Sequence, residues 1–162
     1  MSDQDEQPKG EKPLLVPPVW ALIFFIGIYY VGQSMPGRLP IGILQQGLGF
    51  LIAACGFGIA AWALIQFQRQ KTTYHPTVPG AATSLVTDGV YTITRNPMYV
   101  GMALVLAGEA FYFGTVLGGL LVMVFIGVIT AVQIIPEERA LARLFGPEFE
   151  AFKYRTPRWL FF

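Results

Sequence analysis

The sequence is poor in the residues that build metal sites, disulfides and charged surfaces. Its 162 residues include one cysteine, Cys55, and one histidine, His75, which excludes an internal disulfide and argues against a zinc site. Charged residues make up 13% of the chain, against roughly a quarter in a typical soluble domain. The net charge of +1 offers no basic surface for a nucleic acid. We therefore expect neither a metal ion nor a nucleic acid as a partner.

The chain is instead rich in apolar stretches, with 54% hydrophobic residues and a mean hydropathy of +0.53. Four such stretches run over about residues 14–32, 41–67, 98–113 and 115–135. A helix needs roughly 20 residues to cross the hydrocarbon, so the third stretch is short and the second is long enough to tilt. The sequence predicts an all-α integral membrane protein with about four transmembrane helices, the last two joined in a tight hairpin at Gly114.

Lysine and arginine gather on one side of these predicted spans. They precede the first span, lie between the second and third, and follow the fourth, whereas the opposite side has Arg38 alone. Because such residues favour the cytoplasmic side, we predict a multi-pass protein with both termini in the cytoplasm. The expected location is a bacterial inner membrane, since no eukaryotic targeting signal is visible. We expect residues 1–13 to form a disordered tail and residues 14–162 to form a single membrane-embedded domain.

The first polar segment on the predicted cytoplasmic side leads into the third span. Asp88-Gly89 is a turn signal. Asn96-Pro97 predicts the start of the third helix, with Asn96 as its N-cap and proline in the first turn. Arg95 is thereby placed at the membrane surface beside a helix N-terminus, which is a natural site for an anion.

The second polar segment follows the fourth span. Pro136 should kink or restart the helix, which places Glu137 and Glu138 in a new first turn, where acids are favoured. The helix that follows is amphipathic, and Gly146-Pro147 breaks it before a second short helix. We expect this cytoplasmic C-terminal region to lie along the membrane interface.

Small and acidic residues inside the spans give further expectations. Small residues four positions apart, Ala54 with Gly58 and Gly114 with Gly118, predict close contacts between helices. Glu109 is the one carboxylate within a span. Because it falls near the outer end of its helix, we expect it to reach the lipid headgroups rather than to take part in chemistry.

A series of motifs follows in order between residues 72 and 162. They read Leu-Val-Thr-x-Gly-x-Tyr at 85–91, Arg-Asn-Pro-x-Tyr-x-Gly at 95–101, Glu-Glu-Arg at 137–139, Phe-Gly-x-Glu-Phe at 145–149 and Pro-Arg at 157–158. With the apolar hairpin among them, they resemble the isoprenylcysteine carboxyl methyltransferases, which belong to a wider group with the phospholipid N-methyltransferases. That family usually has Arg-His-Pro where this chain has Asn96, and asparagine cannot titrate near neutral pH.

The resemblance implies a membrane-embedded, S-adenosylmethionine-dependent methyltransferase that acts on a membrane lipid or a lipid-modified acceptor. It implies that the cofactor is bound by residues of these motifs: Tyr91, Asn96, Pro97, Tyr99, Gly101, Glu137 and Glu138. It further implies that Arg95 is the catalytic residue and that Arg95 and Arg158 bind the acceptor, since a guanidinium can hold a carboxylate through two hydrogen bonds. The Gly-rich loop of soluble methyltransferases is absent, because Ile52 stands where a third glycine would follow Gly47 and Gly49.

Two other functions stay open at this point. One is an NADPH-dependent membrane reductase of the sterol-reductase type, and the other is a non-enzymatic membrane protein that keeps the fold. Taken singly, the residues also have structural explanations: Arg95 as a membrane-surface anchor, and Glu137 and Glu138 as ordinary acids of a helix start. The sequence leaves the acceptor open between a prenylated cysteine, a phospholipid amine and another amphiphile, and it leaves the oligomeric state unspecified.

Overall fold

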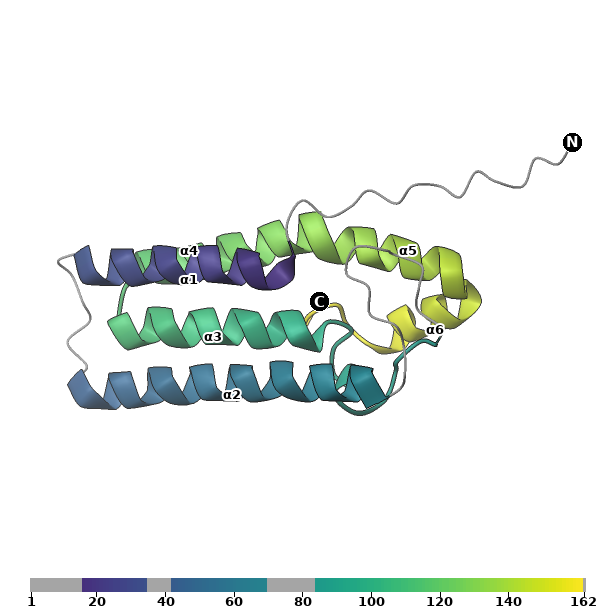
Figure 1. The fold of residues 1–162 in the computed structure, drawn as a ribbon, viewed down its shortest axis with the longest axis horizontal. Coiled ribbons are helices and arrows are strands. Elements are labelled where there is room, and N and C mark those ends of the chain that lie inside the picture. The colour runs from purple at the N-terminus through teal and green to yellow at the C-terminus, as the bar shows by residue number, and fades with distance from the viewer. Residues whose placement is uncertain (1–15, 35–41, 70–83, 162) are drawn as a thin grey trace, which may run out of the picture.

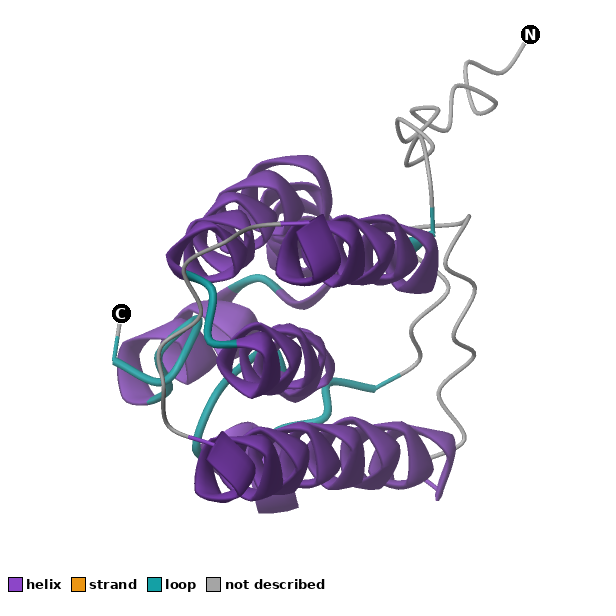
Figure 2. Cartoon of the chain, turned by 90° about the vertical axis from the view of Figure 1, so that its left-hand side faces the viewer, coloured by secondary structure: helices purple, strands orange, loops and turns teal. Residues whose placement is uncertain are grey.

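The computed structural model describes residues 16–34, 42–69 and 84–161, and every regular element within them is helical (Figures 1 and 2). The elements are α1 (Pro17–Ser34), α2 (Gly42–Arg69), the 3-10 turn η1 (Gly89–Thr92), α3 (Pro97–Phe113), α4 (Val116–Ile129), the π-helical turn η2 (Thr130–Ile134), α5 (Ile135–Phe145) and α6 (Pro147–Arg155). The all-α class is confirmed. The predicted tail, Arg38 and His75 lie outside the described residues.

Helix α3 lies at the centre of the bundle. It runs between α2 on one side and α1 with α4 on the other (Figure 1), and it packs against all three. The view along the helices shows the same order (Figure 2). The side chains that fill the space between α1, α3 and α4 are 0–1% exposed: Ile28, Leu106, Phe125 and Ile129. The core is therefore apolar and is shared by the short third helix and its neighbours.

Glycines bring α2 and α3 into backbone contact. A Cβ atom added to Gly101 would lie 2.6 Å from the carbonyl oxygen of Gly56, and one added to Gly108 would lie 2.5 Å from that of Gly49. No side chain fits at such distances, so these helices approach as small-residue helices do in membranes. The predicted contact at Gly58 is wrong, because a Cβ atom there would meet nothing within 4 Å.

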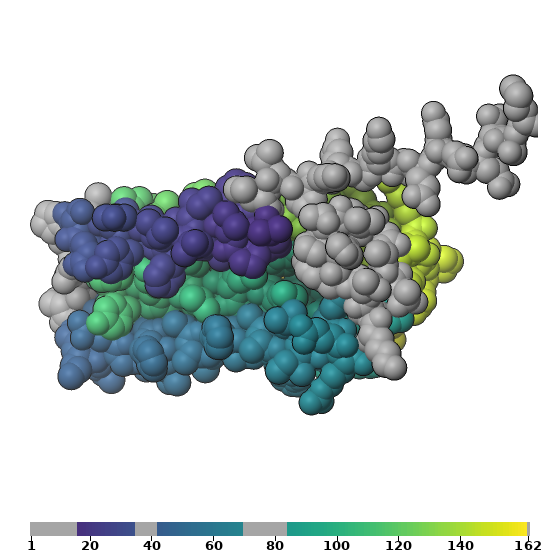
Figure 3. Space-filling model, in the orientation of Figure 1, coloured from purple at the N-terminus to yellow at the C-terminus, as the bar shows by residue number. Residues whose placement is uncertain are grey.

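Two helical stretches of the described chain are long and apolar enough to cross a membrane: α2 and the continuous stretch Val116–Phe145. Only 17% of the most apolar window of α2 and 33% of that of the second stretch are buried. Large apolar side chains are exposed along them: Phe50, Phe57, Trp62, Leu120, Met123 and Val124. Helices α1 and α2 form much of one face of the molecule, with part of α3 visible between them (Figure 3). An uncovered apolar surface of this kind is typical of a membrane protein.

The helix breaks fall where glycine and proline predict them. Gly114 has a φ of +65° and turns α3 directly into α4, which gives the expected hairpin, and Gly146 with a φ of +49° separates α5 from α6. At Pro136 the helix is not interrupted but widened, since the π turn η2 immediately precedes α5. A wider turn accommodates a proline, which has no N–H to continue the α-helical ladder. Glu137 and Glu138 lie in the first turn of α5, as predicted.

Glu109 lies inside the bundle and not at its edge. Glu109 is 8% exposed, and both of its carboxylate oxygens are buried without a hydrogen-bond partner among the described residues. The expectation that this side chain reaches the headgroups is therefore wrong. The reason is that α3 is surrounded by three other helices over this part of its length.

Candidate functional site

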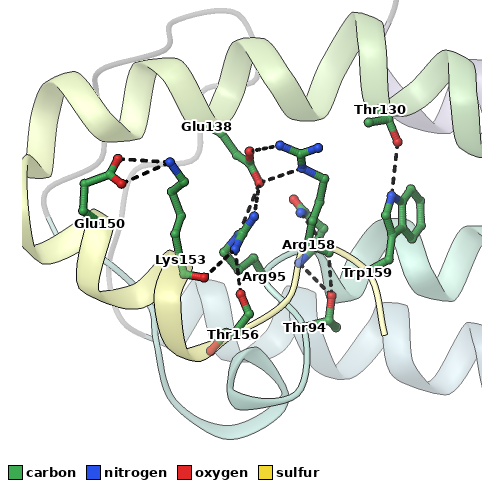
Figure 4. Close-up of polar contacts among 10 residues, drawn as sticks. Thr94, Arg95, Thr130, Glu138, Glu150, Lys153, Thr156, Arg158 and Trp159 are labelled. Carbon is green, nitrogen blue, oxygen red and sulfur yellow. Dashed lines mark hydrogen bonds and ion pairs between the residues drawn. The ribbon is translucent and has the colours of Figure 1, made fainter. Parts of the chain in front are cut away.

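The polar motifs meet at one end of the bundle, where α5 and α6 extend beyond the other helices (Figure 1). Arg95 stands just before α3, Glu138 lies on α5, and Arg158 follows α6. Residues up to 63 positions apart in the sequence are thus brought side by side, and Figure 4 shows Glu138 between the two arginines. The order of the motifs along the chain therefore corresponds to one place in the fold.

Glu138 is the centre of a buried ionic cluster. Its Oε1 accepts hydrogen bonds from Nε and Nη2 of Arg95 at 3.2 and 2.9 Å and from Nε of Arg158 at 3.1 Å. Its Oε2 accepts one from Nη2 of Arg158 at 2.6 Å. These hydrogen bonds raise the pKa of the Arg158 guanidinium above its ordinary value. Both oxygens of Glu138 are therefore committed to two guanidinium groups, and the three side chains together carry one net positive charge.

Arg95 is the more deeply held of the two arginines. Its Nη1 donates to the main-chain oxygens of Lys153 and Thr156 at 3.0 and 2.6 Å, and its main-chain N–H donates to that of Pro157 at 2.9 Å. Its side chain is 10% exposed, against 32% for that of Arg158. Arg95 thus ties the start of α3 to the end of α6, a task that suits a planar group with several donors. Arg158 is the guanidinium that a ligand can reach.

Asn96 occupies the N-cap position of α3, but its side chain does not cap the helix. Its Nδ2 donates to the main-chain oxygen of Arg158 at 3.1 Å, and the hydroxyl of Thr94 donates to the same oxygen at 2.9 Å. The capping prediction is therefore right for the position and wrong for the bond. Pro97 follows as a fully buried residue in the first turn. Together these residues fix the main chain from which the Arg158 side chain extends.

Glu137 precedes Glu138 by one residue and has different partners. Its Oε1 accepts hydrogen bonds from the Tyr99 hydroxyl at 2.8 Å and from Nε2 of Gln133 at 2.7 Å. In the described part of the chain, the ion pairs of arginine and lysine are made with Glu138 and Glu150 and not with Glu137. The Oε1 atom of Gln133 is buried, and no hydrogen-bond donor of the described residues reaches it. This corner therefore fits a ligand group that brings both hydrogen-bond donors and a positive charge.

Tyr91 and Gly101 both pack against α2. Tyr91, on η1, is 8% exposed and packs in a second apolar cluster with Ala63 of α2 and Phe149 of α6. Gly101 is in contact with Gly56 of α2. Both residues thus have a packing role, and their part in binding the cofactor stays a prediction. Tyr99, which is 6% exposed, is brought to Glu137 directly.

The sequence reasoning did not single out Gln133, Thr130 or Trp159. The indole Nε1 of Trp159 donates to the Thr130 hydroxyl at 3.1 Å (Figure 4), which fastens the C-terminal segment to η2. A signal for Gln133 was present, because it is an amide within an apolar run, one helical turn before Glu137. No signal in the sequence marked η2, which carries Thr130 and Gln133, as a π turn.

Comparisons with known proteins place the chain among methyltransferases. The sequence model of the phospholipid methyltransferase family matches residues 44–148. A protein-S-isoprenylcysteine O-methyltransferase of Schizosaccharomyces pombe is 32% identical over 73 residues, which cover 45% of this chain but only 31% of that protein. An uncharacterized protein of Haemophilus influenzae is 38% identical over 63 residues, which are 39% of this chain and 100% of that protein. No solved structure matches the chain.

Proposed function

The chain belongs to the phospholipid methyltransferase family, and on that basis we propose that it is a membrane methyltransferase that uses S-adenosylmethionine and acts on a lipidic or lipid-modified acceptor. The observation that carries the proposal is the set of hydrogen-bond acceptors on Glu137 and Gln133, at the same end of the bundle as the accessible guanidinium of Arg158. A cationic methyl donor would find negative charge at Glu137, and an anionic or polar methyl acceptor would find positive charge at Arg158, at the same end of the bundle.

The residues around Glu137 fit the methyl donor, which would supply the methyl group from its sulfonium. Glu137 would hold the ammonium of the donor's amino-acid part, because a carboxylate with only neutral partners still has charge to offer. Tyr99 orients Glu137 through its hydroxyl. Asn96, Pro97 and the N–H groups at the start of α3 would border the donor's carboxylate, as the positive end of a helix does. Tyr91 and Gly101 complete the proposed cofactor-binding set, to which Glu138 contributes indirectly, by holding Arg95 and Arg158 in place.

The two arginines take different roles in this proposal. Arg158 would bind the polar group of the acceptor, because its side chain is 32% exposed. Arg95 acts as a positioning residue: it holds Glu138, and Glu138 in turn holds Arg158. An acceptor carboxylate is ionised at neutral pH, so the transfer requires alignment and exclusion of water more than a base. The apolar part of the acceptor would enter between the exposed apolar helix faces.

We further propose that α1, α2, α3 and α4 are the four spans, with both termini cytoplasmic in a bacterial inner membrane. The single domain 14–162 would then present α5 and α6 at the cytoplasmic interface, next to the candidate site. Cysteine labelling in a Cys55→Ala background tests this arrangement. An Asp88→Cys variant should react only with reagents that reach the cytoplasm, and labelling of intact cells from outside would reverse the topology.

Ligand binding to the purified full chain in detergent tests the function. Isothermal titration should give saturable binding of S-adenosylmethionine and of its product S-adenosylhomocysteine, with little response to NADPH. The opposite preference would favour a reductase of the sterol-reductase type. Binding of none of these ligands, by a protein with a cooperative thermal transition, would favour a non-enzymatic role.

A further inference from the structure

Gln133 is a buried polar side chain whose hydrogen bonds are only half made. It lies in the π turn η2 and is 2% exposed. Its Nε2 donates to Oε1 of Glu137 at 2.7 Å, while its own Oε1 is buried without a donor from the described residues. Most buried polar groups in proteins are paired, so such an atom calls for a specific explanation.

The orientation of the Gln133 amide follows from its neighbour. When Glu137 is ionised its oxygens can only accept hydrogen bonds, so the NH₂ group of Gln133 faces Glu137 and the carbonyl oxygen points elsewhere. Rotating the amide by half a turn would bring two acceptor oxygens together and would lose the bond at 2.7 Å. The free acceptor is therefore a property of the arrangement and not of an arbitrary choice between oxygen and nitrogen.

The spacing of the two residues brings their acceptors to one face. Gln133 and Glu137 are four positions apart, which is about one helical turn, so their side chains lie next to each other. The Tyr99 hydroxyl and the Gln133 NH₂ group both occupy Oε1 of Glu137. What remains for a ligand is the charge of Glu137, its second oxygen Oε2, to which no described residue donates, and the lone pairs of the Gln133 carbonyl. A primary ammonium matches both, because it has three N–H donors and a positive charge.

We propose that Gln133 is a donor-binding residue, whose Oε1 accepts a hydrogen bond from the α-ammonium of the methyl donor while Glu137 balances its charge. This inference rests on the proposed function. It makes Gln133 a specificity-determining residue, since a nucleoside without the amino-acid part would leave its carbonyl oxygen unpaired.

The test is the variant Gln133→Met, which keeps the length of the side chain and removes its polar atoms. This variant removes an unpaired buried acceptor but also the hydrogen bond that Nε2 donates to Glu137, so its unfolding temperature should stay close to that of the wild type. Its affinity for S-adenosylhomocysteine should fall tenfold or more, and its affinity for 5′-methylthioadenosine, which lacks the amino-acid part, should stay within about threefold. The readouts are isothermal titration and thermal unfolding of the full chain in detergent.

Gln45→Met is the matched control. Gln45 is also a buried glutamine, 4% exposed, but it lies on α2 and donates to the main-chain oxygen of Phe111 at the other end of α3. This variant should lose thermal stability and keep its affinity for S-adenosylhomocysteine. If Gln133→Met behaves like Gln45→Met, with lower stability and unchanged affinity, Gln133 is only a packing residue and the inference is overturned.

A measurement on the wild type keeps the question decidable if Gln133→Met does not fold. S-adenosylhomocysteine should bind at least tenfold more tightly than its analogue without the α-amino group. Equal affinities would overturn the inference while the proposed function stands. Failure of the wild type to bind S-adenosylmethionine or S-adenosylhomocysteine at all would instead overturn the proposed function.

Discussion

Glu137 and Glu138 are neighbours in the first turn of α5, yet one is surrounded by neutral groups and the other by cations. Glu138 accepts hydrogen bonds from two arginines, which compensate its charge. Glu137 accepts hydrogen bonds from a tyrosine and a glutamine, neither of which brings a charge. The side chains of adjacent helix residues point about 100° apart, so two neighbours in one turn can lie in different surroundings.

The difference assigns the two carboxylates different tasks. The cluster of Arg95, Glu138 and Arg158 connects the start of α3, α5 and the C-terminal segment, so its loss should affect the fold first. The corner of Glu137 and Gln133 connects α5 to α3 through the single hydrogen bond from the Tyr99 hydroxyl, and it has acceptors to offer a ligand. Stability and donor binding should therefore respond to different substitutions within two adjacent positions.

Glu138→Ala should give the largest effect on stability. It leaves Arg95, whose side chain is 10% exposed, without its carboxylate. Removing one member of a buried ion pair typically costs 3–5 kcal/mol, and we expect about 3 kcal/mol here because Arg158 can still reach water. Thermal unfolding in detergent measures this. The control is Glu150→Ala, which removes the exposed pair with Lys153 and should cost less than about 1 kcal/mol. Equal losses of stability in the two variants would show that the Glu138 cluster does not hold the fold together more than an exposed ion pair does.

Substitutions of the two arginines should also differ, one affecting mainly stability and the other mainly methyl transfer. Arg95→Lys should cost about 1–3 kcal/mol of stability, because an ammonium cannot replace the hydrogen bonds to Glu138, Lys153 and Thr156 together. Arg158→Lys should lose less stability but should lower methyl transfer to the acceptor, with donor affinity nearly unchanged. Thermal unfolding, titration and turnover of the same preparations decide the matter. If Arg95→Lys is silent in all three, Arg95 is a surface anchor.

Asn96→His should have the smallest effect, and it restores the residue that the related methyltransferases usually have. A ring N–H of histidine can donate to the main-chain oxygen of Arg158 as Nδ2 of Asn96 does. We expect a change in stability of less than about 1 kcal/mol, since one neutral hydrogen bond replaces another, and donor affinity that is unchanged or higher. A large loss of affinity would mean that the Asn96 side chain itself contacts the donor in a way that histidine cannot reproduce.

The helices and their ends could be predicted from the sequence because local physics determines them. Apolar runs, the glycines at 114 and 146 and the prolines at 97 and 136 each act within a few residues. The glycines that bring α2 and α3 together were less predictable. In a chain with 18 glycines, spacing alone does not say which of them face a partner helix.

The site was predictable as a set of residues but not as a set of bonds. Arg95, Tyr99, Glu137, Glu138 and Arg158, which the motifs single out, lie at the same end of the bundle. Which arginine is accessible, and which carboxylate has neutral partners, depends on contacts between segments far apart in the chain. Gln133 lies in a π turn, for which a single sequence has no clear signal.

The most direct test of this account is a comparison of Glu137→Gln with Glu138→Gln in one preparation. Each substitution removes one charge and keeps the size and shape of the side chain. Glu137→Gln should weaken S-adenosylhomocysteine binding by roughly ten- to a hundredfold, equivalent to about 1.5–3 kcal/mol, and should leave the unfolding temperature nearly unchanged. Glu138→Gln should lower the unfolding temperature clearly and reduce affinity by less than about threefold when measured below that temperature. The account is contradicted if both variants lose affinity to the same extent, or if Glu137→Gln is the less stable of the two.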